Sequence, residues 1–222
     1  LEGDEECDDG NREDGDGCSW TCEREQQGVH GGAICEDETW TAADSPHVVV
    51  DDVLVRGFLD PTLTIEAGCT IEVDPGTALL VAEAPDRDGA LVADGTGGEI
   101  AFTSGAGSPA AGDWRGIVFN KRVLPTTVLD NVRVQYAGGG DATASVRIEG
   151  EIGRIHNSTI SNGAAAGVYF GYAGYAVNGF ATNTVAGHAS NPVAVFPHYV
   201  PYLLGGNSLT GNGADAIRVG SS

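Results

Sequence analysis

A repeat of about 25 residues runs through the second half of the chain, and few folds accommodate such a period. An asparagine followed by a short apolar strand recurs at Asn131, Asn157, Asn183 and Asn207. Each is followed by a turn of small residues and then by a second short strand; these second strands span 145–148, 167–170, 193–196 and 216–219. Several short strands in each repeat predict one coil of a parallel β-helix, in which stacked coils bury a continuous core.

The first half of this region shows the same texture of short apolar alternations separated by Gly, Asp and Asn. These alternations lie at 53–55, 63–65, 70–73, 79–81, 90–92, 100–102 and 117–119. The chain contains 34 glycines, which would be costly inside helices, and no long window keeps helical spacing. We therefore expect an all-β solenoid of roughly seven coils.

The repeated asparagines have a structural interpretation. Stacked in register at a turn, Asn131, Asn157, Asn183 and Asn207 can bond one amide to the next, and asparagine tolerates a left-handed backbone. The sequence predicts a structural ladder at these four positions, with a catalytic or ligand-binding role as the alternative.

Acidic residues divide the chain into two parts. Residues 1–44 hold 15 acidic and 2 basic residues, whereas residues 45–222 hold 17 and 9. The first part has few aliphatic residues, so cross-links, a metal ion or a partner must stabilise it. We expect an acidic, cysteine-rich module over 1–44 and the β-helix over 45–222.

The overall charge excludes two classes of partner. A net charge of −21 and a single lysine, Lys121, leave no basic patch for nucleic acid or for an anionic membrane surface. No apolar run approaches the roughly 20 residues of a membrane-spanning helix. The chain contains no methionine and opens without a signal-peptide pattern, so we expect a mature secreted fragment.

The segment EECDDGN at 5–11, followed by DGDGCS at 14–19 and by Cys22, resembles the cysteine-rich repeat of secreted myxobacterial proteins, which is related to Notch-type modules. The likeness covers about 20 residues and implies an extracellular, disulfide-bonded, calcium-binding element. The first cysteine of that repeat, expected upstream of Glu6, lies outside this chain or does not exist. The residue chemistry agrees with calcium, because side-chain oxygens on a glycine-broken loop suit a hard cation. The expected ligands are Asp8, Asp9, Asn11, Asp14 and Asp16, and the alternative is a solvated acidic loop.

The cysteines are odd in number. Cys7, Cys18, Cys22, Cys35 and Cys69 cannot all pair within one chain. We favour a bridge from Cys35 to Cys69, which would join the acidic module to the first coil, and the sequence does not choose a pairing among the other three. The remaining thiol would be free, would reflect a truncated chain or would form an intermolecular bond.

The segments LTIEAG at 63–68, GALVADG at 89–95, IAFTS at 100–104 and GDWRGIVF at 112–119 resemble a second family. They are similar to the right-handed, pectate-lyase-like parallel β-helix domains of bacterial surface and secreted proteins, over about 160 residues. That family includes polysaccharide lyases and glycoside hydrolases, but a fold alone does not establish an activity.

No catalytic constellation is evident in the sequence. The paired carboxylates of a hydrolase would have to be Asp51 with Asp52 or Asp86 with Asp88, and both pairs suit turns better than a substrate groove. The basic residues that a lyase would need are few, and a strongly acidic protein suits an anionic polymer poorly. The five histidines have no serine or aspartate partner at a recognisable spacing.

Aromatic residues gather near the end of the chain. Five aromatic residues fall within twelve positions, at 169, 170, 172, 175 and 180, and three more follow one repeat later, at 196, 199 and 202. In exposed loops, Tyr172, Tyr175, Tyr199 and Tyr202 would contact a protein partner or stack on sugar rings; the alternative is packing within the core or the loops.

The sequence thus predicts a secreted or cell-surface, non-catalytic β-helix with a calcium-binding, disulfide-bonded N-terminal module. We expect a structural or adhesive role through self-association or contact with other extracellular proteins. Because the last residues look like a bare strand, head-to-tail stacking into a fibre is one such mode. The alternative is a polysaccharide-binding or polysaccharide-cleaving protein.

Overall fold

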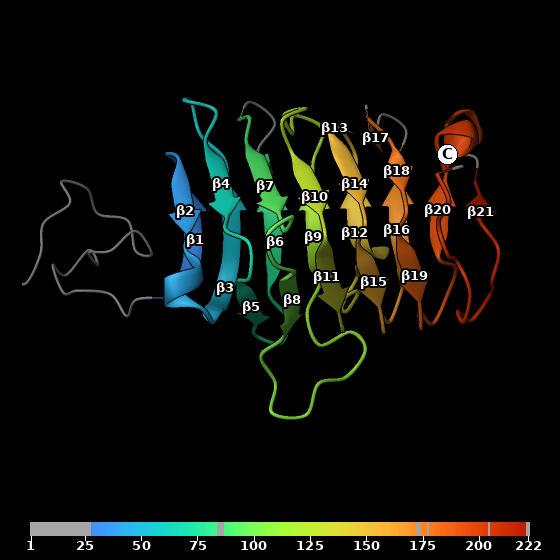
Figure 1. Cartoon of the computed structure of the whole chain (residues 1–222), viewed down its shortest axis with the longest axis horizontal. Helices are drawn as coiled ribbons and strands as arrows, with labels where there is room; N and C mark the ends of the chain where they lie inside the picture. Colours follow the sequence, from blue (N-terminus) through green and yellow to red (C-terminus); the bar gives the residue numbers. More distant parts are fainter. Residues whose placement is uncertain (1–27, 84–86, 172–173, 177, 204, 221–222) are drawn as a thin grey trace, which may run out of the picture.

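The structure, a computed structural model, describes residues 28–83, 87–171, 174–176, 178–203 and 205–220. This part of the chain winds into a parallel β-helix whose coils succeed one another along the horizontal axis of Figure 1. Its named strands pair in parallel with the strand above and the strand below. The all-β parallel β-helix of roughly seven coils is confirmed.

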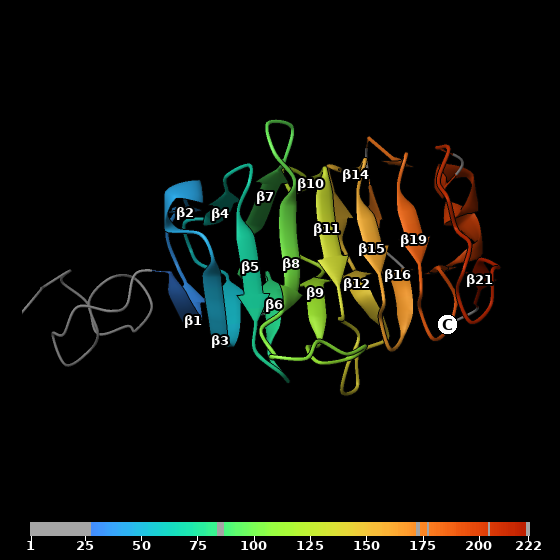
Figure 2. The same ribbon diagram turned by 60° about the horizontal axis from the view of Figure 1, so that its bottom comes forward.

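Each coil passes through three faces, named here C, A and B in the order in which the chain visits them. Face C holds β2 (Glu38–Trp40), β4 (Thr62–Ile65), β7 (Ala90–Asp94), β10 (Val128–Asp130), β14 (Arg154–His156) and β18 (Phe180–Ala181). Face A holds the first part of β3 (His47–Val55), then β5 (Thr70–Val73), β8 (Ile100–Ser104), β11 (Val132–Gln135), β15 (Thr159–Ser161) and β19 (Thr184–Ala186), which lie side by side in Figure 2. Face B holds the last part of β3, then β6 (Ala78–Val81), β9 (Gly116–Phe119), β12 (Ala144–Ile148), β16 (Ala166–Phe170), β20 (Val193–Val195) and β21 (Arg218–Val219).

The solenoid begins upstream of residue 45. Strand β1 (Val29–Ile34) pairs along β3, and β2 pairs with β4. Trp40 and Ile34 are buried in the core, although residues 1–44 as a whole are rich in acidic residues. The composition boundary therefore falls inside the first described coil, which also contains the short 3-10 helix η1 (Ala42–Asp44).

Alternation along the strands builds the core. In β5 and β11 every second side chain is buried, as the period of two in a strand requires. Buried residues then stack from coil to coil: Ile155 pairs with Phe180 on face C, and Val168 pairs with Val193 on face B. The register of these pairs reproduces the repeat of about 25 residues found in the sequence.

The first coil buries an aromatic stack. The indole of Trp40 lies 4.0 Å from the ring of His30 and 5.3 Å from the ring of His47, measured between ring centroids. His47 also bonds through Nε2 to the carbonyl of Thr41 at 2.9 Å. Rings from β1, β2 and β3 thus close the core at this end of the described solenoid.

Two kinds of corner interrupt the strands. The excursion 105–113 between β8 and β9 projects from the solenoid in Figure 1 and makes this coil longer than its neighbours. Behind it Trp114 is fully buried and donates its indole N–H to the carbonyl of Gln135 at 2.8 Å. Between faces C and A the backbone turns through the left-handed region at Asn131, Asn157 and Thr182, with φ of 52°, 51° and 57°.

The described residues contain no helix that is long and apolar enough to cross a membrane.

Candidate functional site

Three of the expected tyrosines meet at the corner between faces B and C, near the C-terminal end of the described solenoid. Tyr175 lies on the short strand β17 (Tyr175–Ala176), which pairs with β13 (Glu151–Ile152) of the coil before. Tyr199 and Tyr202 lie on η2 (Pro197–Leu203), a 3-10 helix. The rings of Tyr175 and Tyr199 stack at 5.8 Å and 13°, and Tyr202 lies 6.3 Å from Tyr199. The fourth expected residue, Tyr172, lies outside the described residues.

A shallow apolar hollow opens between these tyrosines and the core. Its lining residues are Phe170, Tyr175, Ala176, Phe180, Tyr199, Tyr202 and Leu203. Phe170 and Phe180 form its floor, since both are buried and meet edge to face at 5.6 Å. Tyr202 stands at the rim with 55% of its surface exposed, so much of its ring is open to a partner. The site is therefore a partly exposed apolar surface, with aromatic rings around a buried apolar floor.

Polar groups at the rim hold the tyrosines in place. The hydroxyl of Tyr175 donates a hydrogen bond to the carboxylate of Glu151, and this bond raises the pKa of Tyr175 above its usual value. His198, the neighbour of Tyr199 on η2, places its ring 3.8 Å from that tyrosine. This arrangement suits stacking and hydrophobic contact.

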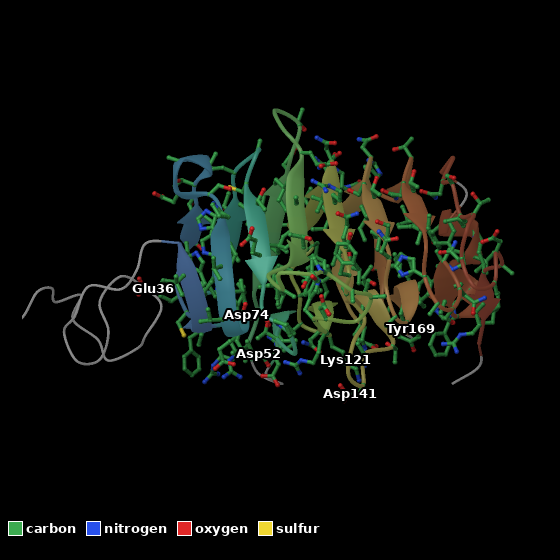
Figure 3. The ribbon with its side chains drawn as sticks, turned by 90° about the horizontal axis from the view of Figure 1, so that it is seen from below. Glu36, Asp52, Asp74, Lys121, Asp141 and Tyr169 are labelled. Atoms are coloured by element: carbon green, nitrogen blue, oxygen red, sulfur yellow. The ribbon has the colours of Figure 1, made fainter. Side chains whose placement is uncertain are left out.

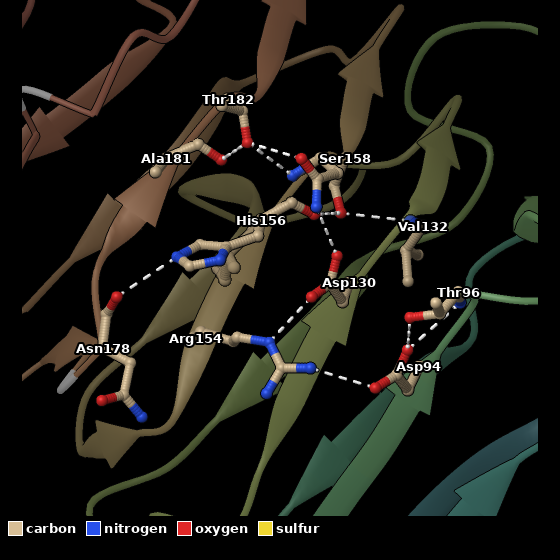
Figure 4. A network of polar contacts seen from close by, with 12 residues as sticks. Asp94, Thr96, Asp130, Val132, Arg154, His156, Ser158, Asn178, Ala181 and Thr182 are labelled. Carbon is tan, nitrogen blue, oxygen red and sulfur yellow. Dashed lines mark hydrogen bonds and ion pairs between the residues drawn. The ribbon is translucent and has the colours of Figure 1, made fainter.

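A second group of polar residues was not found from the sequence. On face C, Asp94 and Asp130 occupy paired positions on adjacent strands, and Arg154 bridges them (Figure 4). The guanidinium of Arg154 donates from Nε to Asp130 at 2.8 Å and from Nη2 to Asp94 at 3.0 Å. The signal that could have located this cluster is an aspartate at the end of two apolar strands of face C, at 92–94 and 128–130.

This network holds its carboxylates by hydrogen bonds and charge. Asp94 accepts hydrogen bonds from the hydroxyl and the backbone N–H of Thr96, which together with Arg154 lower the pKa of Asp94. Asp130, which is buried, also accepts a bond from the Asn157 amide at 2.8 Å. A lowered pKa argues against Asp94 as the general acid of a glycoside hydrolase, which must keep its proton near neutral pH. The network is suited to holding adjacent coils together.

The acid pairs considered in the sequence have local partners. Asp52 forms an ion pair with Arg115 and accepts the backbone N–H of Ala78, while Asp51 is exposed. Asp88 forms an ion pair with Arg122, and Asp86 lies outside the described residues. Asp52, on strand β3, and Asp88 therefore contact residues of other coils, and neither forms a described pair of facing carboxylates.

The repeated asparagines fall into two columns, which refines the expectation of one ladder. Asn131 and Asn157 occupy the left-handed corner, where Thr182 takes the next position. Asn183 and Asn207 lie one residue further along, in register with Ser158. There each side chain caps the preceding coil: Oδ1 of Asn183 accepts the N–H of Ser158 at 3.0 Å, and Oδ1 of Asn207 accepts the N–H of Asn183 at 2.9 Å.

The expected bridge from Cys35 to Cys69 is not formed. Cys69 is buried and its thiol lies 3.5 Å from the carbonyl of Trp40. Cys35 follows the end of β1, which pairs with Val55, whereas Cys69 precedes β5, which pairs with His47. The two cysteines thus lie at opposite ends of β3, too far apart for a disulfide, whose Cα atoms must approach within about 7 Å. Burial raises the pKa of the Cys69 thiol.

The expected calcium ligands Asp8, Asp9, Asn11, Asp14 and Asp16 lie outside the described residues, as do Cys7, Cys18 and Cys22. Within the described ranges, no three His, Cys, Asp or Glu side chains stand close enough to share a metal ion.

Comparison of the chain with models of protein families, with curated proteins and with solved structures gave no match. The candidate function therefore has to be argued from the residues of this chain and their geometry.

Proposed function

We propose that this chain is a non-catalytic structural or adhesive solenoid that contacts its partner through the aromatic surface around η2. The observation that carries the proposal is the exposed ring of Tyr202 beside the Tyr175–Tyr199 stack, over a hollow whose floor is apolar. Apolar surface rimmed by tyrosine is typical of protein contact sites.

A protein partner suits this surface better than a glycan. Tyr175 and Tyr199 stack on each other, and the Tyr175 hydroxyl is bonded to Glu151. Only Tyr202 then offers a largely open ring, whereas sugar binding by stacking needs free aromatic faces and free polar groups for the hydroxyls.

The finer assignments made from the sequence belong to the same proposal. We propose that the solenoid is of the pectate-lyase-like type and that the cysteine-rich segment at 5–22 is an extracellular, calcium-binding module. Native mass spectrometry of the protein, before and after treatment with a calcium chelator, tests the calcium assignment. Loss of one calcium mass on chelation supports it, and an unchanged mass contradicts it.

The contact surface is tested with Tyr202→Ser, which removes the exposed ring without touching the core. The control is Tyr169→Ser, because Tyr169, labelled in Figure 3, is a partly exposed tyrosine on strand β16 of face B and does not line the hollow. Self-association is measured by analytical ultracentrifugation, and glycan binding by calorimetry with cello- and chito-oligosaccharides. Weaker self-association of the Tyr202 variant alone supports a protein-contact surface.

Saccharide binding that is lost in Tyr202→Ser would favour the carbohydrate alternative. Release of reducing ends or unsaturated uronates from a polysaccharide panel, abolished by Asp94→Asn, would contradict a non-catalytic role. Head-to-tail stacking into a fibre stays a prediction, and electron microscopy of the purified protein tests it.

A further inference from the structure

Six loops connect face B to face C, and their described parts lie along one edge of the solenoid, at the top of Figure 1. In chain order the described parts of these corner loops are 56–61, 82–83 with 87–89, 120–127, 149–153, 171 with 174–176 and 178–179, and 196–203. Bridges join their described parts: Gly57 pairs with Asp88, Gly89 with Val123, and β13 with β17. With strands about 4.8 Å apart, five steps give an edge about 24 Å long.

Apolar surface is exposed at both ends of this edge. In the first corner loop Phe58 and Leu59 are 81% and 76% exposed, the largest values among the bulky apolar residues described. The guanidinium of Arg87, from the second loop, lies 3.3 Å from the centre of the Phe58 ring. At the other end, the sixth loop carries η2 with Tyr199 and the exposed Tyr202. Exposed patches of large apolar side chains often mark surfaces that contact another molecule.

Opposite charges occupy the middle of the edge. The third loop carries Lys121, the one lysine of the chain, and Arg122, both exposed. The fourth loop carries Glu149 and Glu151. Arg122 pairs with Asp88 in the second loop, and Glu149 pairs with Arg147 on face B. Lys121, labelled in Figure 3, carries the positive charge of its loop toward solvent.

We propose that a second copy of this chain packs along the edge in antiparallel orientation, an inference that rests on the contact surface proposed above. Reversing the order of six loops sets the first against the sixth, the second against the fifth and the third against the fourth. Phe58 and Leu59 of one copy then meet Tyr202 of the other, twice. Lys121 of each copy faces Glu149 and Glu151 of its partner copy.

Charge decides the orientation of the pair. A parallel pair would set each loop against its own copy, so that Lys121 and Arg122 would face the same two cations, which is unfavourable. The antiparallel pair is two-fold symmetric and closed, so it stops at two copies. A contact made by a single row of corner loops is narrow, which favours a pair that exchanges with monomers.

The apolar contacts are tested on the full chain by sedimentation equilibrium over a concentration series. We expect Phe58→Ser/Leu59→Ser and Tyr202→Ser each to weaken dimerisation about tenfold or more, because each removes a contact that occurs twice. The matched control is Val50→Ser, since Val50 is also exposed but lies on β3 away from this edge. Equal weakening by the control variant would overturn the proposal.

The orientation is tested by charge exchange. Lys121→Glu and Glu151→Lys should each weaken dimerisation. Because Glu151 also accepts the Tyr175 hydroxyl, the charge pairing is tested by the equimolar mixture of the two variants, which should recover dimerisation since each supplies the charge that the other lacks. Circular dichroism verifies that both variants fold. A mixture that associates no better than the separate variants contradicts the antiparallel register.

Lys121 also permits a direct test of contact between copies. Mixed light and isotopically heavy chains, joined by a zero-length carbodiimide cross-linker, should give a light-to-heavy peptide linking Lys121 to Glu149 or Glu151. A chain that stays monomeric but binds a different protein through Tyr202 would overturn this pairing and leave the protein-contact surface standing, whereas saccharide binding through Tyr202 would contradict both. A chain that stays monomeric and binds nothing would contradict both.

Discussion

The ring nitrogens of His30 and His47 lie 2.9 Å apart in the first coil, where Trp40 stacks on both imidazoles. Burial, and secondarily the neighbouring His47, lower the pKa of His30 from 6.5 to about 4. His30 is therefore neutral in the folded protein at pH values where the unfolded chain already binds a proton. This difference couples the stability of the first coil to pH.

Stability should fall as the pH is lowered from about 6.5 to about 4, because only the unfolded chain gains a proton at His30 in that window. The contribution of this group is complete above the window, and about 2–3 kcal/mol of unfolding free energy is lost across it. Urea midpoints followed by tryptophan fluorescence measure the effect. His30→Phe should reduce the pH dependence and leave the part contributed by His188, whose pKa is also lowered by burial, and His198→Gln, at an exposed position, is the control.

Arg154→Met should lower the unfolding free energy by about 1–3 kcal/mol, because the buried Asp130 carboxylate loses its charged partner. Arg133→Met is the matched control. Arg133 also bonds a carboxylate, that of Glu99 at 2.8 Å, but this pair is exposed and should contribute less than about 0.5 kcal/mol. Similar losses in the two variants would show that the bridge between Asp94 and Asp130 has no special role.

Asn183→Ala should be destabilising by about 2–3 kcal/mol, since it leaves the N–H of Ser158 and the carbonyl of Ile155 without the bonds that the amide supplies. The exposed Asn178, on the other side of β18 in the same coil, offers a comparison. Asn178→Ala is expected to change stability by no more than about 0.5 kcal/mol. Chemical denaturation of both variants checks the difference, and an effect confined to Asn178 would refute the capping role.

Gly116→Ala should cost more than about 2 kcal/mol or prevent folding, because the residue has a φ of 112° and a Cβ would lie 2.4 Å from the carbonyl oxygen of Ser145. Gly107, in the excursion before β9, has no atom within 4 Å of such a Cβ. Gly107→Ala should therefore be nearly neutral. Thermal unfolding of the two variants decides whether the close approach of face B strands imposes glycine at 116.

The repeat and the alternation were sufficient to predict the fold, because a β-helix places the same demands on every coil. Residues such as Ile160 and Val185 must point inward and stack, and this requirement is visible in the sequence as a period. The left-handed corner at Asn131 and Asn157 was predictable for the same reason. Thr182 takes that corner in the next coil, so counting asparagines alone placed Asn183 one residue out of register.

Contacts between coils of unequal length were harder to predict. Asp94, Asp130 and Arg154 meet only because the excursion at 105–113 leaves the pairing of faces A and C intact. The position of Cys69 could not be predicted from spacing either, since the distance to Cys35 depends on which end of β3 each cysteine reaches. The aromatic site was found in part because its tyrosines fall in the connecting segments of consecutive repeats.

The corner loops are spaced at equal intervals along their edge of the solenoid. The distance from one loop to the next is set by the spacing of the strands that the loops connect and not by the sequence of the loops. Removing or adding one whole coil between β10 and β16 would change the distance between Phe58 and the tyrosines of η2 by one strand spacing. The residues at both ends of the edge would stay the same. The number of coils therefore sets the distance between the two apolar ends of the edge in equal steps, independently of the residues at either end.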